Sequence, residues 1–192
     1  ASTVNAYATI GGRIVVFRGL LDRLESEDEL LALLAHEMAH VQHRDVATSM
    51  GRGLALGLLL SLVSSDLGGQ VAGQILGNTG GLMMLSYGRE HERQADLAAL
   101  QAVVRLQGHV GGVSRLWDRL HPACPAASQA GTATQSVVPE WLSSHPQDDQ
   151  RRAHTVAWAQ RTGVPLDGPQ QPLSAALRAM QRPADACATA PS

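Results

Sequence analysis

Hydrophobic residues recur every three or four positions in an early stretch of the chain: Leu30, Leu34, Met38 and Val41. This spacing predicts a helix from Glu27 to Arg44. Ser26 followed by Glu29 matches a capping box, and the acidic residues of the first turn suit the positive end of a helix dipole. We therefore expect a buried, regular helix that begins directly after Ser26.

A second helix is predicted from Arg89 to Leu106, where Leu97, Leu100, Val103 and Val104 follow the same period. Between the two helices, the longest hydrophobic run extends from Leu54 to Val63 and is ended by Asp66. This run is too short to cross a membrane, which takes about 20 residues. We expect core or cleft-wall helices here rather than a surface that touches membranes or unfolded proteins.

The stretch before the first helix has the pattern of two strands joined by a glycine turn. Tyr7 to Ile10 and Arg13 to Arg18 flank Gly11 and Gly12, and the second strand is rich in β-branched residues. Such a hairpin can offer a sheet edge to an extended ligand, although a plain core hairpin fits equally well. The expected fold is α+β and mostly helical, with a small N-terminal hairpin beside the first helix.

After Trp158 the composition changes. Residues 163–172 are rich in Pro and Gly, Leu173 to Arg182 could form one short helix, and Pro183 to Ser192 resembles a loose tail. We expect two parts, a domain over residues 1–162 and a Pro/Ala-rich C-terminal tail over residues 163–192.

Composition narrows the classes of partner. The 192 residues suit one domain, and a formal net charge of −2 gives no electrostatic reason to expect nucleic acid. The chain begins without the basic and hydrophobic stretches of a signal peptide, as expected of a mature or shortened form. Cys124 and Cys187 permit one disulfide, which would suit an oxidising compartment, or two free thiols.

The candidate chemistry lies inside the first predicted helix, in the sequence His36-Glu37-Met38-Ala39-His40. Residues four apart share a helix face, so His36 and His40 can direct both imidazoles at one metal ion. Glu37 then lies beside the metal, where its carboxylate can take a proton from a water that zinc makes acidic. This H-E-x-x-H pattern predicts a zinc-dependent hydrolase.

A catalytic zinc needs a third protein ligand. Metzincins would have Gly at position 43 and His at position 46, but this chain has His43 and Val46, which excludes that class. The other common solution is a Glu from a second helix, and Glu92 on the second predicted helix offers it. Asp96, one turn later, could accept a hydrogen bond from the far nitrogen of a ligating histidine and so fix its tautomer.

At this point the chain resembles the gluzincin metallopeptidases that include the HtpX-like, Oma-type and CAAX-prenyl endopeptidases, and most resembles their soluble, BepA-like members. The resemblance covers roughly residues 5 to 152. Its matching blocks are Asn5 to Leu21, Glu27 to His40, Ser86 to Asp96, and Trp141 to Pro146 with Arg151.

The resemblance implies specific roles. His36, His40 and Glu92 match the family's ligands to one zinc ion, Glu37 its general base and Asp96 its supporting acid. His145 matches a histidine that either stabilises the substrate oxyanion or approaches the metal, and Arg151 belongs to the same block. The chain has Ser144 where the family commonly has Thr. A second His-Pro pair, His121-Pro122, lacks the following Arg.

The implied activity is endoproteolysis of peptide or protein substrates, with unfolded or misassembled proteins of the bacterial periplasm or cell envelope as the expected targets. Peripheral association with a membrane or an envelope complex is compatible with this, and we expect no transmembrane helix. A neutral His145 on the zinc ion would give a latent enzyme. The alternatives are a non-hydrolytic binder of unfolded chains, disfavoured by the intact Glu37, and a structural zinc site, disfavoured by the open position.

Overall fold

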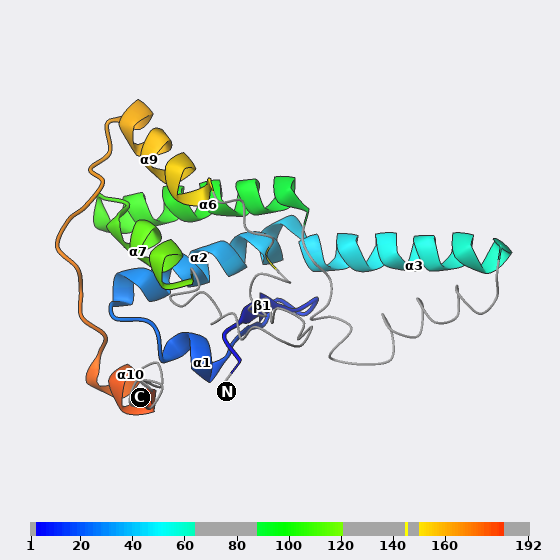
Figure 1. Ribbon diagram of the computed structural model, residues 1–192, viewed down its shortest axis with the longest axis horizontal. Helices are drawn as coiled ribbons and strands as arrows, with labels where there is room; N and C mark the ends of the chain where they lie inside the picture. The colour runs from blue at the N-terminus through cyan, green and yellow to red at the C-terminus, as the bar shows by residue number, and fades with distance from the viewer. Residues whose placement is uncertain (1–2, 64–87, 121–144, 146–149, 183–192) are drawn as a thin grey trace, which may run out of the picture.

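The computed structural model describes residues 3–63, 88–120, 145 and 150–182 (Figure 1). Two short strands precede a set of helices, in the order β1 (Ala6–Ala8), β2 (Ile14–Val16), α1 (Arg18–Leu21), α2 (Glu27–His43), α3 (Asp45–Val63), α6 (Arg89–Gln107), α7 (Gly111–Leu120), α9 (Arg151–Thr162) and α10 (Ala175–Met180). The predicted α+β, mostly helical fold is confirmed.

The predicted hairpin is confirmed, with shorter strands than expected. β1 and β2 pair antiparallel, with Tyr7 opposite Val15. Gly12 has a φ of 73°, and its N–H donates to the carbonyl of Thr9 at 2.9 Å. A left-handed residue is required at this turn, and glycine adopts that conformation without steric cost. The hairpin packs beside α2 (Figure 1).

The boundaries of α2 agree with the sequence prediction. The Ser26 hydroxyl accepts a hydrogen bond from the Glu29 N–H at 3.1 Å, so Ser26 is the N-cap. The Glu29 carboxylate accepts from the backbone N–H of Glu25 at 2.7 Å, one residue before the position that a capping box predicts. The helix ends where Arg44 adopts a left-handed conformation, with a φ of 56°.

The most deeply buried face of α2 differs from the hydrophobic stripe that predicted the helix. Met38 is 51% exposed, and Leu30, Leu34 and Val41 are only partly buried. Leu33, His36 and His40 are instead fully buried. The helix was predicted correctly, but its main buried face was not, because polar residues that gather at one point replace part of the apolar surface.

The core forms where α2 packs against α6 and α7 (Figure 1). Its fully buried large side chains include Leu33, Val103, Leu116 and Leu120. The second predicted helix is α6, although Leu97 from its apolar stripe is 41% exposed. Since α2 and α6 carry the predicted ligands, their contact places those ligands on facing surfaces.

The prediction of core or cleft-wall helices after residue 51 is wrong for the described part of α3. Leu58, Leu59 and Leu62 are 69%, 63% and 83% exposed, and α3 extends away from the other described helices (Figure 1). Hydrophobic content alone therefore did not indicate burial. In the part of the chain that the structure describes, no helix combines the length and apolar character needed to cross a membrane.

Residues 163–182 lie against the start of α2. The N–H of Gln171 donates to Asp28 at 2.6 Å, and the Gln181 amide donates to the carbonyls of Leu21 and Leu24 at 2.7 and 2.8 Å. Leu173, 1% exposed, belongs to the core cluster. The predicted short helix is confirmed as α10. The boundary at residue 162 stays a prediction. The predicted loose tail from Pro183 to Ser192 lies outside the described residues, and so do both cysteines, Cys124 and Cys187.

Candidate metal centre

The two histidines of α2 meet on its buried face. Their Nε2 atoms are 3.1 Å apart, and neither residue has exposed surface. The rings stand edge to face, with centroids 4.7 Å apart. A spacing of four residues on a helix produces this arrangement, as the sequence predicted.

Glu92 on α6 faces both histidines across the contact between the helices. Its Oε1 lies 3.4 Å from Nε2 of His40, and its Oε2 lies 3.5 Å from Nε2 of His36. The residue is 3% exposed. A buried carboxylate at this point fits the expected third ligand.

His145 completes the cluster from outside the described helices. Its Nδ1 lies 3.1 Å from Glu92 Oε1 and 3.4 Å from His36 Nε2, and the residue is fully buried. His36, His40, Glu92 and His145 can each offer one ligand atom, all within 4.8 Å of one another. The sequence predicted that these four residues would gather, while leaving two roles open for His145.

The spacing of these atoms fits a zinc-sized ion. Zinc–nitrogen bonds of about 2.0–2.1 Å in a tetrahedron place neighbouring ligand atoms about 3.3–3.4 Å apart. The separations of 3.1–3.5 Å from His36 Nε2 to His40, Glu92 and His145 agree with that geometry. The donor set of three imidazoles and one carboxylate is also one that zinc accepts.

The outer nitrogens of the two α2 histidines support the same interpretation. His36 Nδ1 lies 3.0 Å from Asp96 Oδ1, and His40 Nδ1 lies 2.7 Å from Asp45 Oδ2, so each ring can donate a proton to a carboxylate. In this tautomer the lone pairs of both Nε2 atoms point at the same place. Such convergence is unfavourable unless a cation or a proton lies between them.

Asp45 is a site residue that the sequence interpretation missed. It is the first residue of α3, is 3% exposed, and contacts His91 as well as His40, with Nδ1 of His91 3.4 Å from Asp45 Oδ1. The available signal was a carboxylate five positions after His40. Its orientation depends on the left-handed Arg44, which a helical pattern does not predict.

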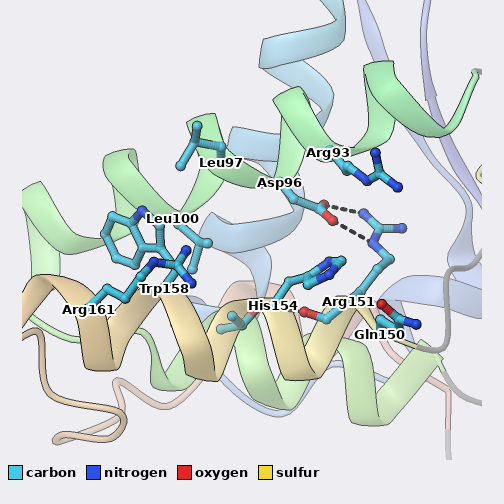
Figure 2. A pocket seen from close by; sticks show the side chains of 10 residues that line it. Arg93, Asp96, Leu97, Leu100, Gln150, Arg151, His154, Trp158 and Arg161 are labelled. Atoms are coloured by element: carbon cyan, nitrogen blue, oxygen red, sulfur yellow. Dashed lines mark hydrogen bonds and ion pairs between the residues drawn. The ribbon is translucent and has the colours of Figure 1, made fainter.

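Arg151, the first residue of α9, contacts two carboxylates that α6 contributes to the site, Asp96 and Glu92. Its guanidinium donates to both oxygens of Asp96, through Nε at 2.7 Å and through Nη2, as Figure 2 shows. Nη1 lies 3.3 Å from Glu92 Oε2, and the group stacks 3.8 Å from the ring centroid of Trp117. The sequence motifs predict Arg151 and Asp96 near the metal, whereas Trp117, whose ring stands edge to face with that of His36, was not predicted as a site residue.

Glu37 lies next to the cluster without belonging to it. It is fully buried, and among the described residues neither of its carboxylate oxygens accepts a hydrogen bond. Its Oε1 is 3.5 Å from His145 Nε2. A buried carboxylate without hydrogen bonds is costly, and it is accounted for when a water and a substrate are its partners.

The electrostatics favour ionised carboxylates. Burial opposes ionisation of Glu92, but the charge and hydrogen bond of His145 outweigh the effect of burial and lower the pKa of Glu92. Burial also opposes ionisation of Asp96, but the charge of Arg151 outweighs it and lowers the pKa of Asp96. Burial also lowers the pKa of His40. For His36, burial is outweighed by hydrogen bonds to Asp96 and Glu92, which raise its pKa to about 9. A metal ion binding there would displace that proton.

The helical fold, the facing ligand helices and the buried cluster beside Glu37 define a metallopeptidase. The family model of Peptidase family M48 matches residues 1–159, and the chain belongs to this family. One relative in it is named a metalloendopeptidase, and the cluster of His36, His40, Glu92 and His145 gives this chain a candidate metal site. The resemblance inferred from the sequence motifs is therefore confirmed.

Three relatives illustrate the similarity. The chain is 30% identical over 156 residues to the mitochondrial metalloendopeptidase OMA1 of Schizosaccharomyces pombe, covering 81% of this chain and 44% of that protein. It is 28% identical over 157 residues to the beta-barrel assembly-enhancing protease of Yersinia pestis, covering 77% and 31%. Over 50 residues it is 54% identical to Protease HtpX of Legionella pneumophila, covering 23% and 17%. The chain thus spans less than half the length of these relatives.

Several residues singled out from the sequence lie outside the described part of the chain. They are Ser86, Trp141 to Ser144 and Pro146 from the family blocks, and the pair His121-Pro122. The hydroxyl of Ser144 and the exclusion of His121 therefore stay predictions.

Proposed function

We propose that this metalloendopeptidase uses one zinc ion, held by His36, His40 and Glu92, to hydrolyse peptide bonds in unfolded or misassembled proteins. One observation carries the proposal: three ligand groups on two packed helices converge beside the buried Glu37 carboxylate. The spacing of the ligand atoms and the tautomers set by Asp96 and Asp45 support zinc as the metal.

A zinc ion held by His36, His40 and Glu92 would supply Lewis acidity, lowering the pKa of a bound water to about 7 and polarising the substrate carbonyl. Glu37 acts as the general base, taking the proton from the attacking water and giving it to the leaving amine. Glu37 suits this role because its buried carboxylate is not hydrogen-bonded to other described side chains and can accept a proton. Asp96 and Arg151 hold the His36 ring in its binding tautomer.

We further propose that His145 has two positions. With Nδ1 next to Glu92 and His36, as here, it can fill the fourth position and keep the enzyme latent. Moved outward, its imidazole could donate a hydrogen bond to the substrate oxyanion. A structure of the zinc-loaded protein with water as the fourth ligand and His145 far from the metal would count against the latent state.

The proposed setting is the bacterial periplasm or cell envelope, in protein quality control, where peripheral association with a membrane or an envelope complex fits. The support is the similarity to a protease of Yersinia pestis whose name refers to the assembly of beta-barrels.

The decisive experiment replaces Glu37 with Gln, with zinc content and cleavage of denatured casein measured on the same preparation. Loss of a positioned general base costs roughly 100-fold to 10,000-fold in rate, so we expect retained zinc and almost no cleavage. Glu90→Gln, an exposed carboxylate on α6, is the matched control and should cleave like the parent. Cleavage by Glu37→Gln at the parent rate would show that the mechanism is wrong. A zinc-loaded parent that suppresses casein aggregation without cleaving it would instead favour a non-hydrolytic binder.

A further inference from the structure

A cavity of about 310 Å³ lies between α6 and α9, and we call it the α6–α9 groove. Figure 2 shows its lining side chains, contributed by both helices. The bonded pair Asp96 and Arg151 forms part of its wall. Among the described residues, no member of the metal cluster lines it, so the groove is a separate cavity behind the pair that supports His36.

The groove has an apolar section large enough for a side chain. Leu100 is 4% exposed and forms part of its wall together with the half-buried Trp158, while Leu97 is 41% exposed. Figure 2 shows Leu100 and Trp158 facing one another between the helices. Small-molecule and side-chain pockets commonly start at about 300 Å³, so one or two apolar side chains fit here.

The groove also carries positive charge. Its described lining contains three arginines, Arg93, Arg151 and Arg161, but only one carboxylate, and that carboxylate, Asp96, is already bonded to Arg151. Arg161 is exposed and forms no ion pair with any residue that the structure describes. Arg93 contacts only the exposed Glu90 there, at 3.4 Å. Two guanidinium groups are therefore available to a ligand.

The spacing of these charges suggests the length of the ligand. Arg161 lies ten residues after Arg151 on α9, which corresponds to about 15 Å along a helix. Arg93 lies close to the Arg151 end of the groove in Figure 2. An extended chain advances about 3.3 Å per residue, so about five residues span the distance.

We propose that the α6–α9 groove binds an acidic peptide segment, with an apolar side chain against Leu97, Leu100 and Trp158 and carboxylates at Arg93 and Arg161. Guanidinium groups pair with carboxylates through two parallel hydrogen bonds, so acidic side chains match the two available arginines in charge and geometry. The inference concerns binding alone, and therefore stands or falls separately from the proposed hydrolysis.

The test uses the full chain carrying Glu37→Gln and loaded with zinc, so that cleavage cannot remove the probe. The probe is a fluorescein-labelled heptapeptide with two acidic residues at each end and alanine, leucine and alanine between them. Fluorescence anisotropy measures its dissociation constant. We expect saturable binding that weakens with salt, and much weaker binding when lysines replace the acidic residues or serine replaces the leucine.

Charge reversal locates the binding. Arg161→Glu should weaken binding by about tenfold or more, whereas Arg105→Glu, an exposed arginine of α6 outside the groove lining, should leave it within about twofold. Leu97→Ser should also weaken it, because the partly exposed side chain can change without disturbing the core. Equal affinity for the lysine peptide, or equal effects of Arg161→Glu and Arg105→Glu, would overturn the proposal. Phosphatidylglycerol vesicles bound through Arg161 while the peptide is not bound would identify a lipid site instead, and would equally overturn it.

Discussion

Replacement of Asp45 tests whether this aspartate sets the metal affinity of His40. The Asp45 carboxylate accepts from His40 Nδ1 at 2.7 Å, and both residues are buried. A hydrogen bond to a charged group contributes about 1.5–3 kcal/mol, which at about 1.4 kcal/mol per tenfold corresponds to about 10-fold to 150-fold. Loss of such a partner of a metal-ligating histidine typically costs about 10-fold to 100-fold in metal affinity.

We therefore expect Asp45→Ala to weaken zinc binding by about 10-fold to 100-fold. Asp45→Asn should have a smaller effect, because its amide oxygen can still accept the His40 proton. Competition with a chromophoric zinc chelator measures both affinities, and circular dichroism checks that the helices are retained. The control is Asp22→Ala, which removes an aspartate that accepts from Arg182 and bonds to none of the metal-ligand candidates. If Asp45→Ala binds zinc within twofold of the parent, the assigned role of Asp45 is wrong.

Three further changes test a buried leucine, the Arg151 guanidinium and the metal ion. Leu173→Ala removes a fully buried side chain and should cost about 2–5 kcal/mol. At about 2–4 °C per kcal/mol for a chain of this size, calorimetry should show a clear fall in Tm, whereas the partly exposed Leu166→Ala should change it little. Arg151→Lys loses the two-pronged contact with Asp96 and should lower kcat/KM about tenfold. The control is Arg152→Lys, which changes an exposed neighbour and should leave kcat/KM unchanged. Equal kcat/KM values for the two variants would refute the role of the Arg151 guanidinium. Chelation of zinc should lower Tm, because the metal binds the folded state; an unchanged Tm would contradict zinc binding by the native chain.

The sequence was most informative where structure depends on neighbours a few residues apart. The positions of His36 and His40 on one face, the Ser26 cap and the β1–β2 turn all follow from local geometry, and all were predicted. Glu92 was found in the same way, since its helix has a clear period. The gathering of these residues with His145 followed from the resemblance to known peptidases.

The sequence was less informative where the answer depends on distant contacts. Met38 was grouped with the apolar stripe, yet it is exposed because buried histidines occupy the opposite side of α2. Trp117 gives no local sign that it will pack against Arg151, a contact that joins α7 to α9. The leucines of α3 were expected in a core or cleft-wall helix, but hydrophobic content predicts burial only when another element covers it.

The bonds at the two ends of α2 have a consequence for substrate entry. At its start, the segment after Gly163 is hydrogen-bonded to Asp28, and at its end the His40 ring is fixed by Asp45. A helix restrained at both ends acts as a rigid platform, so His36 and His40 are expected to keep their positions when a polypeptide enters. The adjustment then falls to His145, whose backbone lies outside the described helices. Room for the scissile bond would thus arise by displacement of one imidazole, with no hinge between helices required.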